Sequence, residues 1–289
     1  MRVLVTGHTG FIGSNMYDYL KEKNIDVIGY SKRDGHDIFD TKKLNQFIKG
    51  VDIVYHFVAY AKPGQSITEP TTAIKVNVES CLNVLEACRK HNVPLIYPSS
   101  CEIYGNSEKP IKEDFEIKPT NPYAASKAAA DRICHSYYES YGMDIKIVRL
   151  FNPYGPRQQV NKICPIFYSQ AVRNKNITVY GNGKDTRDYV YISDIVKGLW
   201  NARKLASGEA INLATSRETT NLEVAKFIIK LTGSKSKITF VKYPKEFGNI
   251  KNQIGSFEKA KKLIGWQPEV KLEEGISKTI EWLKNEDIK

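Results

Sequence analysis

The feature that most constrains this chain is a glycine-rich turn near its beginning. The residues before it, Arg2–Thr6, predict a short buried strand, and residues 11 to about 23 predict a helix. Glycines in such a turn let the backbone pass close to a pyrophosphate, and the start of the following helix supplies free N–H groups and a partial positive charge. The pattern therefore predicts a dinucleotide-binding unit, in which the cofactor contacts are Gly7, Gly10, Phe11, Ile12 and Gly13.

The residues after the second predicted strand, Asp26–Tyr30, bear on which dinucleotide is bound. Folds that bind NAD usually place Asp or Glu there to hold the ribose hydroxyls, whereas NADP sites prefer small or basic residues that accept a 2′-phosphate. Here Ser31, Lys32 and Arg33 follow the strand. The missing carboxylate and the two cations favour NADP over NAD. A Lys-Arg pair in a loop is also ordinary surface charge, so NAD stays open as the alternative.

Short apolar segments alternate with helical segments through the first half of the chain. Strands are expected at 52–57, 95–99 and 144–150, and a helix at 72–91. After the 52–57 strand the residues are small and uncharged, which lets the backbone near Ala59 pass close to a cofactor. This alternation predicts a parallel sheet covered by helices, with its ligand at the carboxyl ends of the strands.

A run rich in Pro and Gly at 151–157 marks the expected domain boundary. We therefore expect an α/β fold with a Rossmann-type doubly wound parallel sheet in residues 1–155. A smaller C-terminal α/β domain, mainly for substrate, is expected in residues 156–289. A predicted helix and strand near 190–214 are expected to return to the first domain.

The segment that begins at Asn121 carries the pattern most suggestive of catalysis. Pro122 and the alanines after it predict a helix start, so Tyr123 and Lys127 project from one face. A fixed ammonium beside a phenol favours the phenolate and would let Tyr123 accept protons near neutral pH. An ordinary helical Tyr/Lys pair is the competing interpretation. Ser100 weighs against that interpretation, because it leaves a predicted strand at the ligand edge, where its hydroxyl can bond a substrate oxygen.

Composition excludes several classes of protein. The formal charge is +11, but the lysines are spread singly without a nucleic-acid motif, so an anionic small molecule is expected rather than DNA or RNA. Arg187 is a candidate anion clamp, with a surface salt bridge to a neighbouring Asp as the alternative.

No stretch approaches the roughly 18 apolar residues of a membrane span, and no signal peptide is evident, so a cytoplasmic location is expected. The spacing of the five cysteines and five histidines predicts reduced thiols and no metal site.

Motifs with a shared order run from one end of the chain to the other. They are Thr6-Gly7-His8-Thr9-Gly10-Phe11-Ile12-Gly13, Asp37-Ile38, Ser99-Ser100, Tyr123 with Lys127, Arg149-Leu150-Phe151-Asn152, Thr186-Arg187-Asp188 and Leu263-Ile264-Gly265-Trp266-Gln267-Pro268. In this order they resemble the extended short-chain dehydrogenase/reductases of the nucleotide-sugar epimerase/dehydratase family, such as UDP-glucose 4-epimerase. The resemblance covers the whole chain. It implies an NAD(P)-dependent enzyme on a Rossmann-type fold, with further cofactor contacts at Asp37, Ile38 and Asn77.

The resemblance also implies a chemistry. Tyr123, with Ser100 beside it, would take the proton from a sugar hydroxyl, usually at C4, while hydride passes from that carbon to the nicotinamide. Lys127 would bind the nicotinamide ribose and lower the pKa of the phenol. Asn152 and Arg187 match positions that hold the nucleotide diphosphate or nearby sugar groups. The expected substrate is therefore a nucleotide-diphospho sugar.

Glu102 leaves the fate of the 4-keto intermediate open. The runs around Asn152 and Arg187 look more like epimerases, which makes C4 epimerisation the leading expectation. A Glu two residues after the serine is similar to 4,6-dehydratases and nucleotide-sugar decarboxylases, in which it would act as a base. Cys101 departs from the dehydratases, which place an Asp acid there. A simple 4-keto sugar reductase is the remaining enzymatic alternative, and a cofactor-sensing binding protein is the non-enzymatic one.

Two further features come from the resemblance. Relatives commonly carry an Arg-Pro-Gly-Asp/Glu segment whose Arg grips the second phosphate, whereas this chain has Lys245-Glu246-Phe247-Gly248-Asn249. The phosphate clamp is therefore expected to be altered or moved to a Lys. Relatives also commonly form homodimers through helices near 75–91 and 124–141. A cluster of Tyr137, Tyr138 and Tyr141 would belong either to that interface or to the core.

Overall fold

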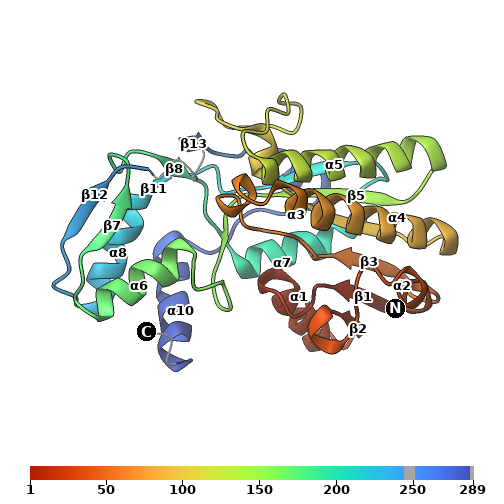
Figure 1. Ribbon diagram of the computed structural model, residues 1–289, viewed down its shortest axis with the longest axis horizontal. Helices are drawn as coiled ribbons and strands as arrows, with labels where there is room; N and C mark the ends of the chain where they lie inside the picture. Colours follow the sequence, from red (N-terminus) through yellow and green to blue (C-terminus); the bar gives the residue numbers. More distant parts are fainter. Residues whose placement is uncertain (244–250, 287–289) are drawn as a thin grey trace.

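The computed structural model describes residues 1–243 and 251–286, and its largest element is a six-stranded parallel sheet (Figure 1). The strand order is β10-β5-β4-β3-β1-β2, so the direction of the chain reverses between β1 and β3. In doubly wound sheets, ligands bind at this reversal, outside the carboxyl ends of the strands. The strands are β1 (Arg2–Thr6), β2 (Asp26–Tyr30), β3 (Ile53–His56), β4 (Leu95–Ser100), β5 (Ile145–Leu150) and β10 (Ala210–Leu213).

Helices cover both faces of this sheet. On one face lie α1 (Phe11–Glu22) and α7 (Ile192–Asn201), and on the other lie α2 (Thr41–Ile48), α4 (Ser80–His91) and α5 (Pro122–Tyr141) (Figure 1). Alternate residues of each strand supply the two cores. Val3 and Val5 of β1 belong to the core with α1, whereas Leu4 belongs to the core with α2, α4 and α5. The predicted Rossmann-type fold is confirmed.

The C-terminal half contributes to two places. The edge strand β10 pairs in parallel with β5, from Ala210 beside Ile147 to Leu213 beside Leu150, and α7 packs against α1. The remainder forms a smaller α/β part, in which α6 and α8 lie against a parallel β7–β12 pair (Figure 1). The helix α9 (Glu258–Ile264) packs against β10. The other elements of the C-terminal half are β6 (Pro153–Tyr154), α6 (Ile163–Val172), β7 (Ile177–Tyr180), β8 (Thr186–Arg187), β9 (Val190–Tyr191), β11 (Thr219–Thr220), α8 (Asn221–Thr232), β12 (Ile238–Val241), β13 (Asn252–Gln253) and α10 (Leu272–Asn285).

The helix expected at 72–91 is not a single regular helix. It begins as α3 (Pro70–Ile74), widens into a π-helical segment at Lys75–Glu79 and continues as α4. Asn77, in the widened turn, uses its side chain to bond the backbone of Tyr60. π-Helical turns of this kind occur frequently at functional sites. The segment 245–249, where the sequence suggests an altered phosphate clamp, lies outside the described residues.

Candidate active site

A cavity of about 430 Å³ opens at the carboxyl ends of β1, β3, β4 and β5. This is where the strand order predicts a ligand. Residues from both halves of the chain form its wall. They include Gly7, Gly10, Phe11, Ile12, Gly13, His56, Phe57, Ala59, Ala61, Pro98, Ser100, Cys101, Glu102, Tyr123, Lys127, Leu150, Asn152, Gln158, Gln159, Lys162, Arg187, Tyr189 and Asn221.

One end of the cavity is the glycine turn between β1 and α1. Gly7 has a φ of +70°, and a Cβ on Gly13 would lie 2.3 Å from the Gly7 carbonyl oxygen, so only glycine fits there. Helix α1 begins after Gly10 with no side-chain cap, which leaves its first N–H groups facing the cavity end. Such N–H groups and the helix dipole suit a pyrophosphate. The residues of this turn therefore fit the dinucleotide that the sequence predicts.

Ser31, Lys32 and Arg33 lie at the end of β2, beyond the cavity wall. The Ser31 hydroxyl is 2.6 Å from the Thr9 hydroxyl and accepts a bond from the Arg33 backbone at 3.2 Å. Lys32 keeps 89% of its side chain exposed and lies 3.9 Å from Asp37. The Asp37 carboxylate also accepts a bond from the backbone of Phe39 at 3.0 Å. The two cations are thus held loosely around the position where an adenosine ribose would lie.

Ile38 and Asn77 were predicted to contact the cofactor, but neither lines the cavity. Ile38 is buried in the core beside α4. The Asn77 side chain bonds the Tyr60 N–H at 2.7 Å and the Ser126 hydroxyl at 2.8 Å. In this structure Asn77 ties the segment that carries Ala59 to α5.

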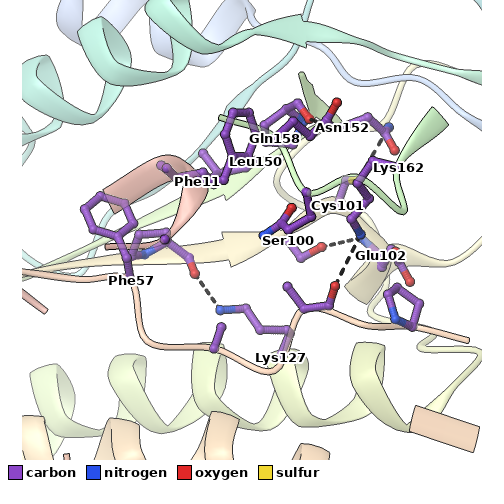
Figure 2. Close-up of a pocket in the computed structure, with 18 of the residues that line it drawn as sticks. Phe11, Phe57, Ser100, Cys101, Glu102, Lys127, Leu150, Asn152, Gln158 and Lys162 are labelled. Carbon is purple, nitrogen blue, oxygen red and sulfur yellow. Dashed lines mark hydrogen bonds between the residues drawn. The ribbon is translucent and has the colours of Figure 1, made fainter. Parts of the chain in front are cut away.

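Helix α5 positions the predicted catalytic pair. The side chain of Asn121 caps its first turn by accepting a bond from the Ala124 N–H at 2.8 Å, and Pro122 occupies the first helical position. Tyr123 and Lys127 then face the cavity from one side of the helix. Ser100, which ends β4, lines the same cavity and lies near enough to the phenol of Tyr123 to lower its pKa. The structure therefore brings Ser100, Tyr123 and Lys127 together, and Figure 2 shows Ser100 and Lys127 beside the cavity.

The expected effect of Lys127 on the phenol is not seen in this structure. Burial, with the nearby Glu102 charge, raises the pKa of Tyr123 above its ordinary value, and the nearby Ser100 only partly opposes this rise. The Lys127 ammonium instead donates to the Pro98 carbonyl at 2.6 Å and lies 4.4 Å from the centre of the Tyr97 ring. Burial lowers the pKa of Lys127 to about 8. The expectation overlooked the cost of burying a phenolate and the competing carbonyl on β4.

Glu102 stands next to this triad. Its carboxylate accepts a bond from the Asn121 side chain at 3.1 Å, and burial raises its pKa despite that bond. Cys101, between Ser100 and Glu102, donates its thiol to the side-chain oxygen of Gln253 at 3.1 Å. Burial raises the pKa of this thiol well above its ordinary value. Cys101 is therefore a neutral group at the position where dehydratases resembling this chain carry an acid.

The opposite end of the cavity is formed by polar side chains from the C-terminal half. Asn152 donates to the Asp188 carbonyl at 3.2 Å, and Arg187 donates to the carbonyl of Lys251 at 3.2 Å. The Asp188 carboxylate accepts bonds from Thr215, Ser216 and Gly255, so it holds the backbone under this end. Ser100, Asn152 and Arg187, the three residues predicted to bind substrate, all line the cavity.

Other residues of the wall were not predicted. Lys162 and Gln158 follow the Pro/Gly-rich run, and Tyr189 bonds Asn221 at 2.9 Å across two elements of the C-terminal half. None of them belongs to a motif with a defined spacing. His56 ends an apolar strand, and strand ends mark the edge of the sheet where ligands bind. That position was the one sequence feature that could have placed His56 at the cavity. Among the described residues, no group of three or more His, Cys, Asp or Glu could hold a metal ion.

No helix in residues 1–243 or 251–286 is long and apolar enough to span a membrane. The five cysteines are free thiols, and all are buried. Cys81 and Cys88 lie in the core beside α4.

Comparison with known proteins identifies the family. Residues 3–214 match the sequence model of the NAD-dependent epimerase/dehydratase family, which is most of the chain. The chain belongs to this family. Membership confirms the resemblance read from the ordered motifs, and it establishes that the protein is of an enzyme class that uses a nicotinamide dinucleotide.

Family members named for different reactions have similar sequence identities to this chain. It is 34% identical to the bovine dTDP-D-glucose 4,6-dehydratase, with 98% of this chain and 88% of the relative covered. It is 31% identical to the zebrafish UDP-glucuronic acid decarboxylase 1, with 99% and 73% covered. The crystal structure of UDP-glucose 4-epimerase from Thermotoga maritima with UDP-glucose superposes with a TM-score of 0.93, at 29% identity and 99% coverage of both chains. The family is therefore clear, and the reaction must be argued from the site.

Proposed function

We propose that the protein is a nucleotide-diphospho sugar epimerase that inverts C4 of a hexose through a transient 4-keto intermediate. The observation that carries the proposal is the meeting of Ser100, Tyr123 and Lys127 at one cavity whose far end is the glycine turn. The three side chains come from β4 and α5, which are rigid elements. A cofactor held along the glycine turn would reach the triad.

The residues of the triad supply the proton chemistry. A nicotinamide bound along the glycine turn would supply the hydride chemistry at C4. Tyr123 takes the proton of the C4 hydroxyl during oxidation and gives it back when the ketone is reduced. The Ser100 hydroxyl, on the same cavity wall, orients the same sugar oxygen. Lys127 holds the nicotinamide ribose, and its charge favours the phenolate once it leaves the Pro98 carbonyl.

The remaining wall residues bind the two ligands. For the dinucleotide we propose the glycine turn with Phe11 and Ile12, the Ala59 segment that Asn77 supports, and Asp37 with Ile38 at the adenosine end. For the nucleotide-diphospho sugar we propose Asn152 and Arg187, since a guanidinium can grip a diphosphate with two parallel bonds. Residues 1–155 and 156–289 would then form a cofactor domain and a mainly substrate-binding domain.

NADP is our proposed cofactor within this NAD-dependent family, with NAD as the alternative. Lys32 and Arg33 are loosely held at the end of β2, so they are free to move onto a 2′-phosphate. A Lys32→Ala/Arg33→Ala double variant should lose affinity for NADP and keep its affinity for NAD, measured by titration of the protein with each dinucleotide. Equal losses for both cofactors would argue against selection at this position.

Glu102 supports a second candidate function. It is the one carboxylate among the described residues of the cavity wall, and it lies close to Tyr123. A dehydratase or decarboxylase would use it as a base after C4 is oxidised. The neutral Cys101 weighs against a dehydratase, because loss of the C6 hydroxyl as water requires an acid. A 4-keto sugar reductase uses the same triad and needs neither group.

A panel of UDP-, GDP-, CDP- and dTDP-sugars, incubated with the protein and either dinucleotide, tests the proposal. NMR and mass measurement of the products should show a C4 isomer of unchanged mass. A product lighter by one water would identify a dehydratase, and one lighter by carbon dioxide a decarboxylase. A protein that binds no dinucleotide and converts no nucleotide sugar would refute the proposal.

We also propose that the protein is a homodimer, joined through the outer faces of α4 and α5. Tyr137 and Tyr141 lie on this face with ring centres 5.0 Å apart, and Tyr137 donates to Glu86 at 2.7 Å. Tyr141 keeps 56% of its surface exposed, whereas Tyr138 packs beside Gly208. Tyr141 is thus available to a partner copy, whereas Tyr137 packs partly against the core.

A further inference from the structure

Gln253 is a buried polar side chain to which the proposed chemistry gives no role. It lies on β13 and exposes 1% of its surface. Its Nε2 donates to the carbonyls of Cys101 at 2.8 Å and Gly105 at 3.2 Å, and its Oε1 accepts a bond from the Cys101 thiol at 3.1 Å. Two acceptors face one end of the amide and a donor faces the other end, so one orientation of the side chain makes all three bonds.

These three bonds hold a short turn that begins after the serine of the triad. The turn is the 3₁₀-helical segment η4 (Cys101–Tyr104), which Ser100 caps through its side chain. Gln253 bonds Cys101 at the start of η4 and Gly105 directly after its end. Burial raises the pKa of the Cys101 thiol, so the thiol keeps the proton that it donates. Ser100, which lines the cavity beside Cys101 (Figure 2), is thus fixed by β4 on one side and, through η4, by Gln253 on the other.

The strand that carries Gln253 also holds the residue proposed to bind the diphosphate. β13 pairs in parallel with β8, and Gln253 lies opposite Arg187 in that pairing. The Arg187 side chain donates to the carbonyl of Lys251 at 3.2 Å. On the other side of Gln253, the N–H of Gly255 donates to the Asp188 carboxylate at 3.1 Å. Gln253 therefore connects the wall that presents Arg187 to η4.

Other bonds attach β13 and the residue after it independently of this side chain. The N–H of Ser107 donates to the Asn252 carbonyl at 3.0 Å, and the N–H of Ile111 donates to the Ile254 carbonyl at 2.8 Å. Both are backbone bonds, and neither involves η4. Replacing the Gln253 side chain should therefore loosen η4 while β13 stays attached to the rest of the molecule.

We propose that Gln253 is a positioning residue, which sets the place of Ser100 relative to a diphosphate held at Arg187 and so aligns C4 of the nucleotide sugar with the triad. The inference rests on the proposed function. In a nucleotide-diphospho hexose, C4 lies across the sugar ring from the carbon that carries the diphosphate. The wall that binds the diphosphate must therefore be fixed to the wall that acts on C4. A misplacement of about 1 Å between reacting groups can lower the rate about 100-fold.

Gln253→Met tests the inference, because methionine has a similar size and makes none of the three bonds. The first readout needs no substrate. It is the S–H stretching band of Cys101 in the infrared spectrum, assigned by its absence in Cys101→Ala. In wild-type protein this band should lie at the lower frequency of a bonded thiol, and in Gln253→Met it should move to higher frequency. An unmoved band would show that Gln253 does not hold η4, and would overturn the inference.

The second readout separates catalysis from binding. The kcat for the nucleotide sugar that the protein converts, counted per dinucleotide-binding site, should fall about 100-fold in Gln253→Met. Affinity for the matching nucleoside diphosphate (UDP, GDP, CDP or dTDP) should keep its wild-type value in calorimetric titration, because Arg187 stays on β8. A role that is only structural would weaken this affinity together with kcat. That result, or an unchanged kcat, would overturn the inference.

Two further variants complete the test. Gln253→Asn keeps the amide on a side chain one methylene shorter, so kcat should fall by a smaller factor with the same retained affinity. It replaces Gln253→Met if that variant does not fold. Gln170→Met is the matched control, because Gln170 accepts a bond from the Thr178 N–H at 3.3 Å and is not among the described residues that line the cavity.

Gln170→Met should leave the Cys101 band and kcat unchanged, and a fall in kcat equal to that of Gln253→Met would overturn the inference. A wild-type protein that converts no nucleotide sugar refutes the proposed function instead. The Cys101 band then decides separately whether Gln253 holds η4.

Discussion

At the scale of single residues, the phenol of Tyr123 is the group on which the proposed chemistry depends. Tyr123→Phe removes its hydroxyl and keeps the ring in place. Turnover of the active nucleotide sugar should fall by about 10³-fold, within the range for loss of a positioned acid-base group. Dinucleotide affinity and thermal stability should change little. Tyr141→Phe, on the exposed end of α5, is the control and should retain full activity.

A buried histidine gives a pH prediction. His56 is 2% exposed, its Nδ1 lies 2.8 Å from the Thr6 hydroxyl, and burial lowers its pKa to about 3. The unfolded chain, in which histidine has a pKa near ~6.5, binds the proton between these two values while the folded protein does not. Folding stability should therefore fall as pH drops below about 6.5.

His56→Asn tests this assignment, since asparagine can keep the bond to Thr6 without titrating. Urea unfolding of both proteins from pH 7 to pH 5 should show a smaller loss of stability in the variant. Parallel losses would mean that other groups dominate this pH range.

Single residues also show what the sequence could and could not predict. Ser100, Tyr123 and Lys127 were found because their chemistry depends on residue type and spacing within two elements. Lys162 carries no such signal, since only folding brings it to the cavity. The pKa of Tyr123 in this structure could not be predicted from the sequence, because burial and the Pro98 carbonyl are properties of the folded site.

At the scale of elements, α5 is fixed to the sheet by a buried ion pair. Arg149 of β5 donates to both oxygens of Asp131 at 3.1 Å and to the Tyr104 hydroxyl at 2.7 Å. Although burial alone would raise it, these bonds hold the pKa of Asp131 below its ordinary value. Breaking a buried pair on one side leaves an uncompensated charge.

Arg149→Met should therefore lower the free energy of unfolding by about 3 to 5 kcal/mol. Arg132→Met is the matched control, because Arg132 pairs with the same Asp131 from a half-exposed position. Its cost should stay below about 1 kcal/mol. Chemical denaturation of the three proteins measures both changes, and similar losses would contradict the assignment of Arg149 as the buried partner.

The turn between β1 and α1 gives a second prediction for an element. Gly13→Ala would place a Cβ 2.3 Å from the Gly7 carbonyl oxygen, so the turn must shift away from the dinucleotide. Affinity for NAD and NADP should fall at least tenfold, or about 1.4 kcal/mol. Ser14→Ala, one residue on, should keep its affinity in the same calorimetric titration. Unchanged binding in Gly13→Ala would argue against the glycine turn as the pyrophosphate site.

The elements themselves were predictable where periodicity is strong. Strands β1 to β5 could be predicted from apolar runs and from the turns between them. Strand β10 could be predicted from a similar apolar run. The π-helical turn at Lys75–Glu79 was not predictable, because its widening accompanies the bonds from Asn77 to a distant loop. The short strands of the C-terminal part are two to four residues long, too short for a periodic signal.

At the scale of the whole molecule, the proposed dimer predicts the mass of the protein in solution. Leu82 and the 52% exposed Ile74 line a shallow hollow on the outer face of α3 and α4. Light scattering should give twice the chain mass of 32.8 kDa for the wild type. Leu82→Arg, which places a charge on this face, should give the monomer mass with unchanged folding. A wild-type monomer at micromolar concentration would remove the dimer proposal.

The two halves of the chain form one cavity for both proposed ligands. The parallel sheet forms the end proposed for the dinucleotide, and the C-terminal half forms the end proposed for the nucleotide sugar. The most direct test of the proposed chemistry follows the hydrogen on C4 itself. A nucleotide sugar deuterated at C4 is converted by the protein in ordinary water, and the label is located in the product by NMR. We expect the label to stay in the product, at C4 for an epimerase or moved to C6 for a dehydratase, and Tyr123→Phe to abolish the conversion. Loss of the label to water, or undiminished conversion by Tyr123→Phe, would contradict hydride transfer at C4 with Tyr123 as its acid and base.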